Sequence, residues 1–303
     1  MSRSYKATGI NLKGMPMGET DRLLTILTVE RGLIRVIAPG ARKHKSRLAG
    51  RSSQFVVNEL LIVQGKRLDK LVQAETVRSF PGLSADLGKL TASQYLAELV
   101  LSQALSEQPQ SELFALLVEH LQRLEKATKD GILACLSQGI FHFLALAGVA
   151  PEVQRCSLSQ IEIMPELTSP DWRVGFSPIA GGIVSLEHIG PQQFNSLKAK
   201  SPVGSYAIKG GERSMRGYER SPNQQPETSV ITALELALLQ RLGQPELITS
   251  QSTPGLVSES EVTRLLWQRI ERLLRQYAQY HLDRPIRSAV LIDTCFPAAM
   301  SSE

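Results

Sequence analysis

A run of basic residues without acidic neighbours is the clearest chemical feature of this 303-residue sequence. No Asp or Glu occurs between Glu30 and Glu59, so cationic side chains accumulate over 28 residues. Charge runs usually lie on solvated loops, but a one-sided basic surface can also bind nucleic-acid phosphates by displacing condensed counterions. We predict a phosphate-binding surface made by the seven cations of this run: Arg31, Arg35, Arg42, Lys43, Lys45, Arg47 and Arg51.

Other residues that could do chemistry are isolated. Glu19 and Asp21 form a carboxylate pair that could hold a metal or act in acid–base work, but we favour a turn hydrogen bond from Asp21 or pairing with Arg22. His120 and His142 lie in apolar stretches, where core packing is the simpler interpretation. Phosphate-binding glycine loops, the Gly-x-Ser-x-Gly elbow and His-Glu-x-x-His are all absent. We therefore expect a protein that is not an enzyme, with an enzyme site between two domains as a remaining hypothesis.

The charge is divided unevenly along the chain. The net charge is +5, but residues 1–80 hold 15 Lys and Arg against 6 Asp and Glu, whereas residues 81–303 hold 19 against 23. A basic module of net +9 is thus joined to an acidic one of net −4. The three distant cysteines form no disulfide framework and indicate a reducing compartment.

Residues 1–80 have the pattern of a small β-barrel. Five short stretches of β-branched or alternating residues are separated by Gly, Pro and Asp turn signals, namely Tyr5–Leu12, Leu23–Val29, Leu33–Ala38, Phe55–Val63 and Leu71–Val77. The segment from Gly14 to Gly18 is expected to be a turn. Five strands are the number in an OB fold, with an SH3-like barrel as an alternative.

Helical spacing replaces this pattern after Gly82. We expect helices over Leu87–Leu105, Ser111–Lys129, Ile132–Ala147, Pro226–Arg241 and Glu259–Tyr280, and a short apolar segment over Ala289–Phe296. Residues 151–190 form short Gly- and Pro-rich pieces, and residues 201–229 are a polar connection. The uncharged stretch 131–151 indicates a buried helix rather than a membrane span. The predicted fold is α+β: a barrel domain at 1–80 and a mainly helical domain at 81–303.

The order of several motifs resembles the RecO family of bacterial recombination mediators. In the basic module the resembling segments are Gly18-Glu19-Thr20-Asp21-Arg22-Leu23-Leu24, Glu30-Arg31-Gly32-Leu33 and Ala38-Pro39-Gly40-Ala41-Arg42-Lys43. Further along they are Gly148-Val149-Ala150-Pro151-Glu152, Phe176-Ser177-Pro178 and Arg284-Pro285-Ile286-Arg287-Ser288.

That resemblance implies an OB-fold domain followed by a helical domain with a zinc-ribbon-like insert at about 151–190. It implies a cytoplasmic, nucleoid-associated protein of DNA repair and recombination that binds single- and double-stranded DNA and anneals complementary strands. It also implies assistance in loading RecA, with RecR and the C-terminal tail of single-strand-binding protein (SSB) as partners, and no membrane. The alternative from the residues alone is an RNA-binding accessory factor, because phosphate contacts do not separate RNA from DNA.

The zinc-binding positions of that family are degenerate here. Where relatives carry two Cys-x-x-Cys pairs, this sequence has Cys156 with Ser159 and Ser185 with His188. Structural zinc is held by four Cys or His ligands, so we expect no zinc and no other cofactor.

Three further predictions concern binding. Arg123, Lys126 and Lys129 end a helix and could meet the acidic SSB tail, although cations there also favour the helix's own dipole. The basic residues Lys209, Arg213, Arg216 and Arg220 could touch a strand, but we favour a solvated loop. The barrel offers only Tyr5, Phe55 and Phe80 for base stacking, which predicts binding mainly through phosphates.

Overall fold

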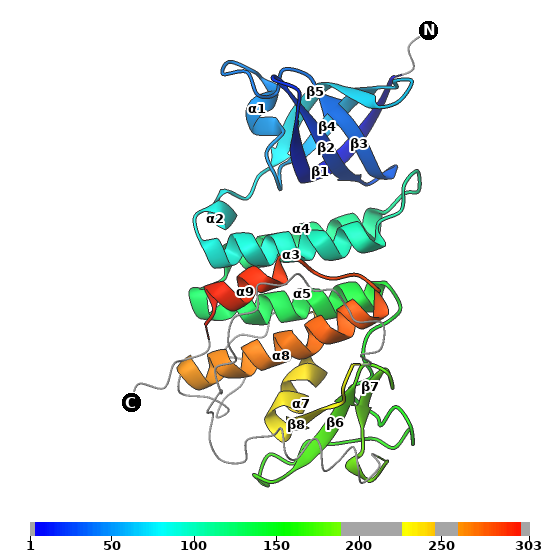
Figure 1. The fold of residues 1–303 in the computed structure, drawn as a ribbon, viewed down its shortest axis with the longest axis vertical. Helices are drawn as coiled ribbons and strands as arrows, with labels where there is room; N and C mark the ends of the chain where they lie inside the picture. Colours follow the sequence, from blue (N-terminus) through cyan, green and yellow to red (C-terminus); the bar gives the residue numbers. More distant parts are fainter. Residues whose placement is uncertain (1–3, 189–225, 246–259, 298–303) are drawn as a thin grey trace. The chain divides into compact units, whose positions relative to one another are not determined.

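The computed structural model describes residues 4–188, 226–245 and 260–297, and it divides into two compact units, residues 1–126 and 127–303 (Figure 1). The boundary between the two compact units follows Lys126. The domain boundary expected near residue 80 is a different boundary and stays a prediction. The basic residues from Lys209 to Arg220 lie outside the described residues.

Unit 1 begins with a closed five-stranded barrel, which confirms the number of strands expected for residues 1–80. Around the barrel the strands follow the order β1-β2-β3-β5-β4, and β4 pairs with β1 to close it. All neighbours are antiparallel except β3 and β5, which are parallel. The strands are β1 (Ser4–Met17), β2 (Asp21–Thr28), β3 (Gly32–Ala38), β4 (Val57–Val63) and β5 (Asp69–Arg78).

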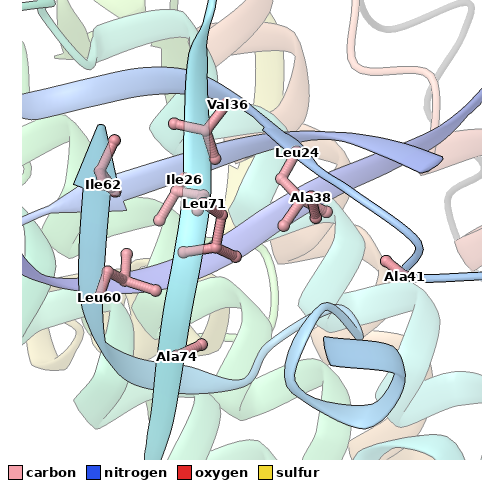
Figure 2. Close-up of a cluster of buried hydrophobic side chains, with 9 residues drawn as sticks. All are labelled: Leu24, Ile26, Val36, Ala38, Ala41, Leu60, Ile62, Leu71 and Ala74. Carbon is pink, nitrogen blue, oxygen red and sulfur yellow. The ribbon is translucent and has the colours of Figure 1, made fainter. Parts of the chain in front are cut away.

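The barrel interior is filled by alternate residues of the strands, as a period of two requires. Figure 2 shows this cluster, whose strand residues are Leu24, Ile26, Val36, Ala38, Leu60, Ile62, Leu71 and Ala74, with Ala41 added from the loop after β3. Because Leu24 and Val36 point inward, their neighbours Leu23, Arg35 and Ile37 point outward. The same alternation that builds the core therefore sets which side chains a ligand can meet.

The first hairpin is longer than the sequence pattern indicates. The expected turn from Gly14 to Gly18 is wrong for its first residues, because β1 continues through Met17 and pairs with β2 down to Asp21. The chain reverses over Gly18–Thr20, where Gly18 has a φ of +61°. Gly14 and Pro16 are tolerated within the strand. Because β1 continues past them, the β1–β2 hairpin is longer and has more residues on its outer face.

Four helices complete unit 1. They are α1 (Leu48–Arg51), α2 (Pro81–Ser84), α3 (Leu87–Gln103) and α4 (Ser111–Lys126). The carboxylate of Asp86 caps α3 by accepting the Lys89 N–H at 2.9 Å. The short helix α1, which the sequence pattern did not indicate, lies between β3 and β4.

The β2–β3 turn is hydrogen-bonded to the α3–α4 connection. The Leu33 N–H donates to the Leu105 carbonyl at 2.9 Å, and the Gln110 N–H donates to the Val29 carbonyl at 2.9 Å. Gly32 lies between these bonds with a φ of +62°, and an added Cβ would be 2.1 Å from the Leu105 carbonyl oxygen. Only glycine fits this close backbone approach.

Unit 2 is mainly helical with a small antiparallel sheet of order β7-β6-β8. Within its described residues the elements are η1 (Lys129–Gly131), α5 (Ile132–Leu146), β6 (Arg173–Ser177), β7 (Gly182–Val184), η2 (Leu186–His188), β8 (Ser229–Thr232), α7 (Ala233–Arg241), α8 (Ser260–His281) and α9 (Ala289–Cys295). The expected helix α5 is confirmed and largely buried. Among the described residues no helix is long and apolar enough to cross a membrane.

One expected helix of unit 2 starts later than its pattern indicates. Over 226–232 the helix expectation is wrong, because Ser229–Thr232 pairs with β6 as strand β8. Val230, Ile231 and Thr232 are β-branched, which favours a strand. Helix α7 begins after Thr232, whose hydroxyl accepts the Glu235 N–H while the Glu235 carboxylate accepts the Thr232 N–H.

Helix α8 is anchored on the β6–β7 turn. The Tyr277 ring lies 5.8 Å from the Phe176 ring, and its hydroxyl donates to the Gly181 carbonyl at 3.3 Å. The His281 Nε2 lies 3.0 Å from the Pro178 carbonyl oxygen. The Phe176–Pro178 and Gly181–Gly182 segments therefore have a packing role within unit 2.

Candidate nucleic-acid interface

The loop that follows β3 carries four exposed cations on the barrel. Arg42, Lys43, Lys45 and Arg47 are all exposed. We call these four residues the basic loop. The backbone around them is ordered by turn hydrogen bonds from Lys43 to Gly40 and from Ser46 to Lys43, both at 3.0 Å. Such cations are available to an anionic ligand.

The basic loop is tied to the β1–β2 turn. The Arg42 N–H donates to the Thr20 carbonyl at 2.8 Å, and its guanidinium donates to the Gly18 carbonyl at 2.9 Å. The Asp21 carboxylate accepts the Gly40 N–H at 2.8 Å and the Thr20 hydroxyl at 2.9 Å. Asp21 thus makes the turn hydrogen bond expected from the sequence, which confirms that interpretation.

Arg22 has a different partner from the one considered for it. Its guanidinium donates to the Ser52 hydroxyl at 3.2 Å, just after α1. The end of α1 is also held from inside the barrel, because the buried Asn11 and Asn58 side-chain amides both donate to the Arg51 carbonyl, at 2.7 and 2.9 Å. The segment between β3 and β4 is therefore fixed at both ends.

The charge of Asp21 contributes to this anchoring in a pH-dependent way. The Gly40 N–H, the Thr20 hydroxyl and the nearby charges of Lys43 and Lys70 hold the pKa of Asp21 below its usual value. A carboxylate with a depressed folded pKa stabilises the fold above its unfolded pKa of about 3.9, and that stabilisation is lost as the pH falls through the folded pKa.

Replacing Asp21 by alanine is therefore expected to loosen the basic loop at neutral pH. Amide exchange of a peptide covering residues 39–47 should be faster in Asp21→Ala than in the wild type, since Gly40 loses its acceptor. The difference in thermal midpoint between the two proteins should shrink as the pH falls below about 4. Glu19→Ala, at the exposed turn, is the control, and equal exchange in all three proteins would contradict this role.

The remaining predicted cations do not join the basic loop. Arg31 lies before β3, at its opposite end, and a seven-residue strand is roughly 20 Å long. Its guanidinium lies 4.1 Å from the centre of the Tyr5 ring, and the Tyr5 hydroxyl donates to Asp69 at 2.7 Å. Arg35 is exposed midway along β3, and Arg51 is half-buried at the end of α1.

Three further cations of the barrel were not indicated by the sequence pattern, and one of them, Lys70, lies near the turn that anchors the basic loop. Lys70 on β5 is paired with Ile37, and its charge acts on Asp21 as that of Lys43 does. Lys66 and Arg67 are exposed in the β4–β5 loop. The sequence did contain one sign of these residues, because Lys66, Arg67 and Lys70 are three cations within five residues. Asp69 lies among them and lowers the net charge of this segment.

The barrel presents no exposed aromatic ring among residues 4–80. Phe55 and Phe80 are buried, and Tyr5 is half-buried between Arg31 and Asp69. Base stacking on an aromatic platform is thus not offered by the described part of the barrel. The basic loop offers charge alone.

The predicted partner-binding cations have ordinary structural surroundings. Arg123 is paired with Glu119 one turn earlier in α4, whereas Lys126 and Lys129 are exposed. Arg123 and Lys126 lie in the last turn of α4, where they complement the helix dipole. Binding of a partner by these residues stays a prediction.

The two histidines are part of the packing. His120 is buried in α4, and the His142 Nε2 lies 2.8 Å from the Leu242 carbonyl oxygen. Neither belongs to a group of three or more His, Cys, Asp or Glu side chains able to hold a metal, since no such group occurs in the described residues.

The degenerate zinc positions keep a turn but not a ligand set. Cys156 is buried, its Sγ accepts the Ser185 N–H at 3.4 Å, and its carbonyl accepts the Gln160 N–H at 2.8 Å. Burial raises the pKa of the Cys156 thiol, but hydrogen bonds from Ser159 and from backbone N–H groups outweigh it and leave the pKa below its usual value. His188 is exposed, and hydroxyls stand at 159 and 185. These residues do not fit zinc.

An apolar cluster surrounds this turn. Cys156 and Val184 are its buried members, with Ile163, Ala180 and Leu186 packed against them. Chelation by EDTA is therefore expected to leave the thermal midpoint unchanged, and metal analysis should find no stoichiometric zinc. The triple variant Ser159→Cys/Ser185→Cys/His188→Cys should gain one zinc and become EDTA-sensitive, whereas Leu158→Cys should not. A wild-type protein that lost zinc and stability together in EDTA would contradict this.

Comparison with known proteins places the two regions in one family. Residues 1–80 match the family model described as Recombination protein O N terminal, and residues 84–188 match Recombination protein O C terminal. The chain is 52% identical to the DNA repair protein RecO of Gloeothece citriformis, over 98% of this chain and 99% of that one. It is 51% identical to that of Nostoc punctiforme, over 98% of each chain, and 43% to that of Synechococcus elongatus, over 97% and 96%.

These matches define a class of DNA repair and recombination proteins that are not enzymes, as expected. The chain belongs to the RecO family. The resemblance proposed from its motifs is thereby confirmed at full length.

Proposed function

We propose that this chain is a recombination mediator that binds single- and double-stranded DNA and anneals complementary strands. With RecR it would assist the loading of RecA onto strands coated by SSB. The observation that carries the DNA-binding part is the exposed basic loop on a barrel that presents no exposed aromatic ring over residues 4–80. The names of the relatives support the repair context.

The barrel has the features of an OB fold. Its closed strand order β1-β2-β3-β5-β4 and the helix α1 between β3 and β4 support this assignment over an SH3-like barrel. In OB folds the face of strands 2 and 3, with the β1–β2 and β4–β5 loops, binds oligonucleotides. Here Arg42 is bonded to the first loop, and Lys66 and Arg67 lie in the second.

Binding through phosphates is compatible with annealing. A strand held by its backbone keeps the edges of its bases free, so a complementary strand can pair with them. Duplex DNA presents phosphates too, which accounts for binding of both forms. If five phosphates are contacted, the slope of log K against log salt for single strands is about −3.5.

The acidic part of the chain is proposed to bind proteins. Exposed Lys126 and Lys129, with Arg123, are the residues we propose for the acidic SSB tail, and the chain is proposed to act at the cytoplasmic nucleoid. RecR is proposed as a partner through the family alone.

Strand annealing by the full-length protein tests the proposal. Two complementary oligonucleotides, one fluorescent and one quenching, should pair faster with protein than without, and the gain should fade with salt. Matched DNA and RNA strands in competition should show preference for DNA. Absence of annealing, or stronger competition by RNA, would overturn the proposal.

A further inference from the structure

An apolar row crosses the outer face of the barrel next to the basic loop. Met15 of β1 is paired with Leu23 of β2, and Leu23 is paired with Ile37 of β3. All three point outward, because Leu24 and Val36 fill the interior. Met17, two residues beyond Met15, lies on the same face, opposite Asp21. We call these four residues the methionine row.

Both methionines are accessible. Met15 and Met17 are 40% and 39% exposed, and Leu23 and Ile37 are half-buried beside them. The outer face of an antiparallel strand usually carries polar residues at such positions. The row is therefore an exposed apolar feature that the barrel core does not explain.

Cations border the row on both sides. In the next outward register, Lys13 is paired with Thr25 and Thr25 with Arg35. At the end of the row Ile37 is paired with Lys70. Gly18, which follows Met17, accepts the hydrogen bond from Arg42 of the basic loop. The apolar row and the proposed phosphate contacts are thus continuous.

We propose that the methionine row binds the faces of unstacked bases of a single strand while the bordering cations bind its phosphates. The inference rests on the proposed function, since it assigns a second component to the same interface. A thioether side chain is polarizable and makes favourable contacts with aromatic rings. A row across three strands at about 4.8 Å spacing extends about 10 Å. Unstacked bases lie further apart than the roughly 3.4 Å of a stacked strand, so the row can contact about one or two base faces.

This component distinguishes single strands from duplexes. Bases within a duplex are stacked and cannot lie on the row, whereas the cations contact phosphates of either form. Since only base faces are contacted, the pairing edges stay free for a second strand. The row adds affinity that is insensitive to salt.

The test is the double variant Met15→Gln/Met17→Gln in the full chain, with Val77→Thr as control. Val77 is 59% exposed on β5 and lies outside the row. Binding of a dT oligonucleotide and of a duplex of equal length is measured over a salt series. The double variant should bind the single strand about tenfold more weakly at every salt concentration, with unchanged slope and with duplex affinity within twofold. Val77→Thr should change neither.

Oxidation of the wild-type protein gives a second readout that does not depend on a variant. Hydrogen peroxide converts exposed Met to the sulfoxide. The dT oligonucleotide should slow this reaction at Met15 and Met17, whereas the duplex should not, and Met164, 72% exposed in unit 2, is the internal reference. The inference would be overturned if the double variant bound the single strand as tightly as the wild type, or if it lost equal affinity for the single strand and the duplex. It would also be overturned if Met15 and Met17 were oxidised at the same rate in the presence of either DNA form. A wild type that bound neither DNA would instead refute the proposed function.

Discussion

Replacing Arg42, Lys43, Lys45 and Arg47 together by alanine is expected to weaken single-strand binding by about three orders of magnitude at 50 mM salt. Each phosphate that is no longer neutralised reduces the salt slope for single strands by about 0.7, so four such phosphates reduce it by about 2.8. The side chains are exposed and lie in one loop, so the core of the barrel is untouched. Fluorescence anisotropy over a salt series measures affinity and slope together.

The control for this variant removes the same net charge elsewhere. Four other exposed cations, Lys6, Lys126, Lys129 and Arg155, are replaced by alanine. Their removal should change the slope by less than one unit, because none of these residues belongs to the proposed DNA interface and the binding assay contains no SSB. Similar effects in both variants would show that general charge, rather than the basic loop, binds the strand.

Gly32→Ala is expected to destabilise unit 1 by about 3 kcal/mol. A left-handed φ costs an L-residue about 1–2 kcal/mol, and the added Cβ would in addition be 2.1 Å from the Leu105 carbonyl oxygen and 2.5 Å from that of Gln108. Relief of these contacts requires that the β2–β3 turn leave the α3–α4 connection. Hydrogen bonds from Leu33 and to Val29 would then be broken.

Gly18→Ala is a matched control for the backbone cost. Gly18 has a φ of +61°, against +62° for Gly32, but an added Cβ there meets nothing within 4 Å. Gly18→Ala should therefore lower the free energy of unfolding only by the cost of the left-handed φ, about 1 kcal/mol. Urea unfolding followed by circular dichroism measures both variants. Equal destabilisation would mean that the turn moves freely away from residues 105–108.

The elements that could be predicted from the sequence are those with a local pattern. Alternation identified all five barrel strands, and apolar spacing identified α5 and α8 within a few residues. The extension of β1 through Pro16 and the strand β8 could not be found this way. In both cases a distant partner, β2 or β6, decides the conformation.

The candidate interface shows the same division. The basic loop was found because its residues are contiguous, and contiguity in a loop ensures proximity. Arg31 was grouped with them although β3 carries it to the far end, and Lys70 was overlooked because parallel pairing with Ile37 brings it close from another strand. The methionine row is invisible in sequence, since its members come from three strands and meet only through register.

The two hydrogen bonds between the β2–β3 turn and residues 105–110 affect where chimeras of two family members can be joined. In a chimera joined at residue 80, the β2–β3 turn of one parent would have to pack against residues 105–110 of the other, where Gly32 and Val29 make their close backbone contacts. A chimera joined after residue 126 would keep both sides of that contact from one parent. Recombination between relatives should therefore tolerate crossovers after α4 better than crossovers between the barrel and α3.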